Sequence, residues 1–315
     1  MIDFRYHVVS IVAVFLALAL GLFIGATSLR DTVKGDITTR TDKLFKTNGS
    51  LRSQIGDLKN QVKDAQSVDN ALMPYAVQGR LAGESVVVIS APGIDSNIRT
   101  NVLKALPLAG ATVAGDIRLQ DHLLDSQQAE FLGTLADQVA IAGRPLPNAS
   151  GNIRALALLA DVLVTSPQQK TVSRTAATRV LSAFSAGSLL TMSGDATQPG
   201  SVAVLIAPPG PPVGASPAPG ADISSLLATF ARDLDANSTG TVVAGPQTSD
   251  KTGGLVDLIR GDRSLRDLVT TVDDADLPGG IIATVLALAE QSGGQVGSYG
   301  IGPGHDAPVP LPSSS

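Results

Sequence analysis

The feature that most constrains this chain is an uncharged apolar run near its start, "VVSIVAVFLALALGLFIGATSL", residues 8–29. As a helix this run is roughly 33 Å long, enough to cross a hydrocarbon core of about 30 Å. The apolar part of a secretory signal is shorter, about 7–15 residues, so we predict a retained transmembrane helix. Cleavage after Ser28 is an alternative, because small residues precede that position. A channel wall would need several such helices, since this one has no polar face, and a buried soluble helix rarely stays apolar for so many turns.

Charges around this helix leave its orientation open. The short N-terminal segment, residues 1–7, contains Arg5 and Asp3, whereas four basic residues follow the helix between Arg30 and Lys43. Counted alone, these basic residues would place the C-terminal side in the cytoplasm. Three aspartates are interleaved with them, and long domains cross membranes largely regardless of charge.

Residues 30–73 are predicted to form a coiled-coil stalk. Leucines recur at heptad position d and β-branched residues at position a, a pattern that favours a parallel two-stranded coil. Asn48 at an a position fits this arrangement, because two such amides pair when the helices are parallel and in register. The predicted interface consists of Leu44, Asn48, Leu51, Ile55, Leu58, Val62, Ala65 and Leu72.

An alternative for this seam is packing against the chain's own globular domain. Glycines at 35, 49 and 56 and an aspartate in the seam, Asp69, weaken a coiled coil. Pro74 is predicted to end the helix, because proline lacks the backbone N–H and disfavours helical geometry in the residue before it.

Residues 80–303 are predicted to form a globular α/β domain. Continuous apolar runs such as "SVVVIS", "SVAVLIA" and "GTVVAG" alternate with helical stretches, as in a parallel sheet covered on both faces. We therefore expect an open, mostly parallel sheet of about five parallel strands flanked by helices. The apolar run 281–289 is too short to span a membrane and is assigned to a core helix. A Pro/Gly-rich loop is expected at 208–222, and a disordered tail at 304–315.

One helix of this domain has a recognisable start signal. Ser126 is expected to cap the helix in "LDSQQAEFLGTLADQVA".

Composition excludes several classes of function. The chain has 315 residues, a net charge of −5 and no cysteine. The acidic balance argues against nucleic acid as a partner, and the absence of cysteine excludes disulfides and zinc–thiolate sites.

A nucleotide site is the first chemistry that the motifs suggest. "GPQTSDKT", residues 245–252, follows a strand and precedes a helix as a phosphate-binding loop does. Asp250 replaces the second glycine, however, and puts a negative charge beside the place of the phosphate. We predict no cofactor-binding residue in this loop.

Catalytic and metal sites are not predicted either. The histidines, His7, His122 and His305, are scattered, and no Ser/His/Asp set or G-x-S-x-G elbow is present. The acidic stretch "DDAD", residues 273–276, is interpreted as a solvated turn, with loose binding of a hard cation as the alternative. We therefore predict a protein that is not an enzyme, with surface positions for His122 and His305 and no metal ligands.

The opening "MIDFRYHVVSIVAVFLALALGLFIG", together with the later "VVVISAPG", resembles the actinobacterial copper transport protein family named after the mycobacterial protein MctB. This resemblance implies an envelope protein of copper efflux and copper homeostasis, described as a pore-forming outer-membrane component. It also implies a single-pass topology with the globular domain on the non-cytoplasmic side. Corynebacterial homologues are linked instead to septal envelope assembly. No site residue is transferred, because the matching motif is the anchor and its flanks.

Three hypotheses result from the sequence. The first is a copper-efflux component of the cell envelope, and the second a non-enzymatic dimeric scaffold for envelope assembly or septation. The third, an enzyme with a degenerate nucleotide loop, is opposed by Asp250. The expected partners are a membrane, a second copy in a parallel homodimer or higher homo-oligomer, and an envelope or septal protein. Copper ions are expected to interact indirectly or weakly, and no nucleic acid is expected.

Overall fold

The structure is a computed structural model that describes residues 4–194, 197–211 and 221–311, with the backbone alone at 4–5, 27–42 and 221–222. The middle of the expected Pro/Gly-rich loop, 212–220, lies outside the described residues. The chain divides into two compact units, residues 1–65 and 66–315, and each is described by itself.

Helix α1, Phe4–Val77, contains the predicted span and the predicted stalk. Within the described residues, Tyr6–Ala26 is the one helical segment long and apolar enough to cross a membrane, and none of its hydrophobic window is buried. The prediction that Pro74 ends the helix was wrong by about one turn. Proline removes one backbone bond without stopping a helix that packs elsewhere, and Gln78 N still donates to Pro74 O at 3.2 Å.

The last turns of α1 belong to the globular unit. Met73 and Ala76 pack against its core, and Val77 is fully buried. Packing of this apolar edge therefore outweighs the cost of a proline in the last turns.

A seven-stranded sheet forms the centre of the globular unit, in the order β3-β2-β1-β4-β5-β6-β7. Every neighbouring pair is parallel except β2–β3. The mostly parallel sheet agrees with the sequence, although six strands, rather than about five, run parallel. The strands are β1 Ser85–Ser90, β2 Thr112–Leu119, β3 Leu190–Ser193, β4 Val202–Ile206, β5 Gly240–Ala244, β6 Thr270–Val272 and β7 Ser298–Tyr299.

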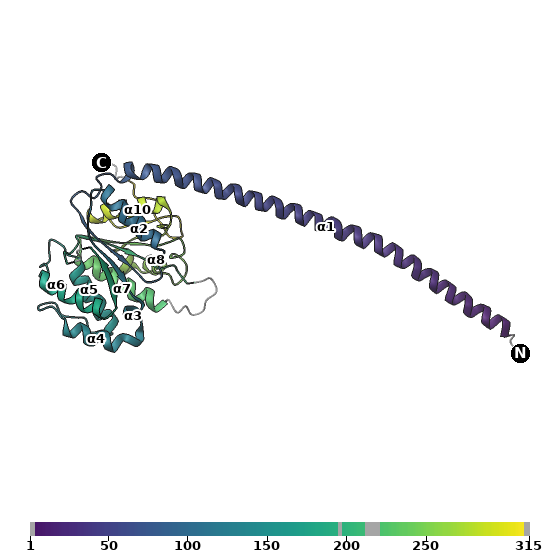
Figure 1. Cartoon of the computed structure of the whole chain (residues 1–315), viewed down its shortest axis with the longest axis horizontal. Coiled ribbons are helices and arrows are strands. Elements are labelled where there is room, and N and C mark those ends of the chain that lie inside the picture. Colours follow the sequence, from purple (N-terminus) through teal and green to yellow (C-terminus); the bar gives the residue numbers. More distant parts are fainter. Residues whose placement is uncertain (1–3, 195–196, 212–220, 312–315) are drawn as a thin grey trace. The chain divides into compact units, whose positions relative to one another are not determined.

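Helices cover both faces of this sheet (Figure 1). One face carries α2 and α10, and the other carries α4 to α8. Side chains alternate between these layers, since Val86 and Val88 face the first and Val87 and Ile89 the second. The helices are α2 Ser96–Leu108, α3 Asp121–Leu124, η1 Ser126–Gln128, α4 Ala129–Gln138, α5 Gly151–Leu163, α6 Arg174–Ala186, α7 Ala221–Asn237, α8 Leu255–Gly261, α9 Arg263–Arg266 and α10 Pro278–Ser292.

The structure confirms the predicted core helix at 281–289 but not the predicted capping residue, Ser126. The apolar run 281–289 lies in α10 and is a core helix, as predicted, because Ala283, Val285 and Leu288 are fully buried. The capping residue, in contrast, is Asp125 and not Ser126. The Asp125 carboxylate accepts from Gln127 N at 2.9 Å at the start of η1, one turn before α4.

Residues 300–311, which we name the C-terminal strap, are ordered where the sequence suggested disorder from 304 onward. Asp306 N donates to Ser298 O at 2.7 Å, and Gly300 N donates to Ala307 O at 3.2 Å. Val309 packs against the core. Backbone hydrogen bonds to β7 hold this Pro/Gly-rich segment in place. The sequence did not predict this order, because β7 has only two residues and shows no strand pattern of its own. Residues 312–315 lie outside the described residues.

Candidate functional site

The predicted seam of α1 is a solvent-exposed apolar face. Its side chains Leu51, Ile55, Leu58 and Val62 are each 51–59% exposed. Leu44 and Leu72 are exposed as well, as are Asn48 and Ala65. The described part of the chain therefore leaves this face uncovered, and whether a second copy covers it stays a prediction.

The C-terminal end of the seam, in contrast, packs against the globular unit. Asp69, at an a position, is half-buried in the globular unit, and a Cβ added to Gly279 of α10 would lie 3.7 Å from its Oδ2. Met73 packs against the same unit. Packing on the chain's own domain, the alternative for this seam, thus holds for its last turns, whereas the four apolar residues from Leu51 to Val62 stay exposed.

The loop at residues 245–252 has a closed conformation. Ser249 is fully buried, and both its N–H and its hydroxyl donate to Pro246 O, at 2.8 and 2.7 Å. Gly254 N donates to Lys251 O at 2.7 Å. Within the loop, the N–H groups of residues 245, 247, 249 and 251 all donate inside the protein, which leaves too few free donors for a phosphate cradle.

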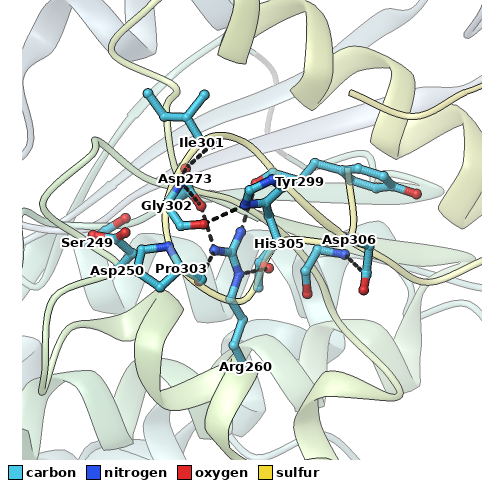
Figure 2. Close-up of polar contacts among 12 residues, drawn as sticks. Ser249, Asp250, Arg260, Asp273, Tyr299, Ile301, Gly302, Pro303, His305 and Asp306 are labelled. Carbon is cyan, nitrogen blue, oxygen red and sulfur yellow. Dashed lines mark hydrogen bonds and ion pairs between the residues drawn. The ribbon is translucent and has the colours of Figure 1, made fainter. Parts of the chain in front are cut away.

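Asp250 fills the remaining space of this loop. Its side chain is 2% exposed, and a Cβ added to Gly302 of the strap would collide with its Oδ2. The negative charge that opposed nucleotide binding in the sequence is therefore packed under the strap (Figure 2).

A buried ion pair fastens the strap to the sheet (Figure 2). Arg260 of α8 meets Asp273, which directly follows β6, with Nη1 and Oδ2 2.5 Å apart. Three further donors of Arg260 are used as well, by Thr271 Oγ1 at 2.9 Å and by two backbone oxygens of residues 299 and 303 at 2.7 and 3.1 Å. Asp273 Oδ1 accepts from the N–H groups of Ile301 and Gly302 at 2.9 and 3.0 Å. A group satisfied this completely serves structure rather than catalysis.

The interpretation of residues 273–276 as a solvated turn was wrong. Asp273 is fully buried and Asp274 is 5% exposed, whereas Asp276 is exposed and accepts from Gln247 N at 3.0 Å. Burial, reinforced by the negative charges of Asp273 and Asp276, raises the pKa of Asp274 to about 6. The sequence could not show this, because the partners of Asp273 come from α8 and from the strap, about 30 residues further on.

Copper ligands are not gathered at one place. Among the described residues, no group of three or more histidine, cysteine, aspartate or glutamate side chains could hold a metal ion. His122 and His305 are exposed, as predicted. The thioethers of Met73 and Met192 pack against different cores, on the two faces of the sheet. The described side chains therefore offer no clustered site of the kind that a soft ion such as Cu(I) prefers.

An apolar N-terminal helix long enough to cross a membrane, joined to a doubly covered α/β sheet, is the architecture of a membrane-anchored protein, and no catalytic constellation is present among its described residues. The chain belongs to the MctB family, since residues 1–310 match the family described as "Copper transport outer membrane protein, MctB".

Three mycobacterial relatives resemble the chain over nearly its whole length. It is similar to proteins named copper transporter MctB from Mycobacterium tuberculosis, Mycobacterium bovis and Mycobacterium leprae. Each is 28% identical over 317 residues, covering 96% of this chain and 98% of the relative. The family is therefore one of copper transport, and its named members are transporters rather than enzymes.

Proposed function

We propose that this protein serves copper efflux as a non-enzymatic, membrane-anchored subunit that acts as a parallel homodimer joined through α1. The observation that carries the proposal is the exposed apolar seam from Leu51 to Val62. The names of the relatives supply the transported ion. The scattered histidines and methionines support a role in which copper contacts the protein weakly or through a partner.

The energetics of the seam favour a partner helix. Complete burial of one aliphatic side chain is worth about 1.5–3 kcal/mol, so the seam of two helices provides on the order of 10 kcal/mol. Two chains anchored in one membrane also leave it in the same direction, which suits the parallel, in-register arrangement that Asn48 favours.

The apolar segment is compatible with the same arrangement. Ala17, Gly21 and Gly25 recur every four residues, and small residues at this spacing let two helices approach closely within a membrane. This segment has no polar face, so a conducting pore would require several copies or a partner protein. We place the globular unit on the non-cytoplasmic side, as the family resemblance implies.

A complementation experiment tests the proposal. A deletion strain receives the wild type, the seam variant Ile55→Glu/Val62→Glu, or the matched control Ser53→Glu/Asn60→Glu, whose positions lie opposite the seam in the heptad. Cellular copper, septum morphology and the amount of protein in the envelope are measured. We expect the seam variant to leave cellular copper as high as in the deletion strain and the control to restore it. Full restoration by a seam variant present at wild-type amounts would overturn the proposal.

The second candidate function is a scaffold for envelope assembly or septation. It is favoured by the absence of a clustered metal site among the described residues. In the same experiment, disturbed septa with unchanged cellular copper in the deletion strain would select the scaffold over copper efflux.

A further inference from the structure

A cavity of about 270 Å³ lies at the carboxyl ends of β1 and β2, next to the first turn of α2. In open α/β folds, ligands bind at the carboxyl edge of the sheet, and the first strand–helix turn holds their phosphate groups. The Arg260 network and the strap close the β5–β6 part of this edge, as described above. The β1–β2 part is hollow.

The sheet register brings polar side chains together at this cavity. Ser90 at the end of β1 pairs with Arg118 at the end of β2, so both side chains lie on the face that carries α2. Arg99, in the first turns of α2, also lines the cavity and pairs with Asp116 of β2, with Nη1 and Oδ2 2.5 Å apart.

Two of these groups lack partners among the described residues. The hydroxyl of Ser90 is buried in a residue only 2% exposed and makes no hydrogen bond. The guanidinium of Arg118 is exposed and forms no ion pair. A buried hydroxyl without a partner carries a desolvation penalty, which a ligand accepting its hydrogen bond would remove.

The end of α2 adds favourable electrostatics. This helix has 13 residues, and its N-terminus carries partial positive charge. Asp95 caps it by accepting from Asn97 N at 2.9 Å. The negative charges nearby are Asp95, Asp116, which neutralises Arg99, and the exposed Asp121, which lines the cavity. A highly charged polyphosphate is therefore disfavoured, and a group with one or two negative charges, such as a carboxylate or a phosphate monoester, is preferred.

We propose that this cavity binds a small oxyanion, a phosphate or carboxylate group, carried on a hydroxyl-bearing molecule of monosaccharide size. Arg118, Ser90 and the α2 N-terminus bind the oxyanion. Asp121 and Gln120, which line the cavity as well, accept hydrogen bonds from the hydroxyl groups. The proposal is independent of the α1 dimer and of copper transport, because none of its residues lies on α1.

Calorimetric titration of the full chain in detergent tests this site with four probes: glucose 1-phosphate, glucuronate, inorganic phosphate and glucose. We expect saturable binding of glucose 1-phosphate and glucuronate, at least fivefold weaker binding of inorganic phosphate, and no binding of neutral glucose. Equal affinity for inorganic phosphate and glucose 1-phosphate would overturn the hydroxyl contacts, and no saturable binding of any anion would overturn the site.

Variants separate binding from folding. Arg118→Ala and Ser90→Ala should each weaken binding of glucose 1-phosphate at least fivefold, while Arg174→Ala, which removes an exposed arginine from α6, should leave it unchanged. Ser90→Ala should not lower the thermal stability of the free protein, because it removes a hydroxyl without a partner. Unchanged affinity in Arg118→Ala would overturn the proposal.

Discussion

Arg260 shows how one side chain gives order to a segment that its sequence makes flexible. From α8 its guanidinium reaches β6, β7 and the strap at once, through Thr271, Asp273 and the backbone oxygens of residues 299 and 303. Glycines at 300, 302 and 304 allow the strap to follow this tight path. A Cβ at Gly300 or Gly302 would collide with the carboxylate of Asp273.

Replacing Arg260 by methionine should therefore destabilise the globular unit strongly. The fully buried Asp273 would keep its backbone donors but lose its counter-charge, and breaking a buried pair in this way costs about 3–5 kcal/mol. Denaturant unfolding of the full chain measures the loss, and faster amide exchange at Ile301 and Gly302 would locate it. Arg266→Met is the control, because this exposed arginine pairs loosely with Asp267 at 3.6 Å and should cost less than 1 kcal/mol. Equal effects of both variants would show that the buried pair adds nothing to stability.

Asp274 makes stability depend on pH in the opposite direction from an ion-paired carboxylate. Its pKa of about 6 in the folded state exceeds the ordinary value near 4, so the folded protein holds this proton more tightly than the unfolded chain. The stabilisation is complete below about pH 4 and is lost as the pH rises through 6.

Asp274→Asn should remove part of this dependence. We expect wild-type stability to fall between pH 5 and pH 7.5, and the variant to lose about 1 kcal/mol less over the same interval. Thermal unfolding at the two pH values gives the comparison. The stability of the variant should still fall somewhat as the pH rises, because burial also raises the pKa of Asp235 to about 6. The same loss in both proteins would contradict the assignment to Asp274.

At the scale of elements, the sequence predicts what depends on local apolar patterning. The strands at β1, β4 and β5 and the helices α7 and α10 are long enough to show their periodicity, and the prediction of an α/β sheet was correct. The two-residue β7 and the four-residue α9 exist because of tertiary contacts, and no local pattern shows them, whereas α8 is the helix expected after residues 245–252. The Asp273 site was missed for the same reason, because its donors are assembled by the strap.

Close packing of α4 on α5 gives a test at this scale. A Cβ at Gly151, the first residue of α5, would collide with Ala129 O and Gly133 N of α4. Gly151→Ala should therefore cost about 1–3 kcal/mol or more, through overpacking against a backbone that cannot yield. Gly261→Ala at the end of α8 is the control, because nothing lies within 4 Å of the added methyl group. It should stabilise the protein by about 0.5–1 kcal/mol, as alanine is the better helix former. The free energy of unfolding of both variants is measured by chemical denaturation. A loss in Gly151→Ala alone would show that the close backbone contact, and not the replacement of a glycine as such, causes the destabilisation.

The two units of the molecule differ in how they cover their apolar side chains. The globular unit buries its apolar side chains in two cores and closes half of its sheet edge with its own strap. Helix α1, in contrast, leaves its seam exposed over residues 44–65. Because Asp69 and Met73 already pack on the globular unit, a continuous coil with a second copy should end near Ala65, although Leu72 of the predicted interface is itself exposed. The Asp69 that weakens the heptad pattern in the sequence thus marks the end of the interface.

The absence of cysteine gives a direct test of the parallel dimer. In a parallel, in-register coil, each a-position residue faces its own copy, so Asn48→Cys should form an intermolecular disulfide when the full chain is oxidised in membranes. Ser53→Cys, on the opposite side of the helix, should cross-link far less. Met73→Cys, which is turned toward the globular unit, should form no intermolecular disulfide. An antiparallel or monomeric helix would leave Asn48→Cys no more cross-linked than Ser53→Cys, and that result would remove the dimer on which the proposed function rests.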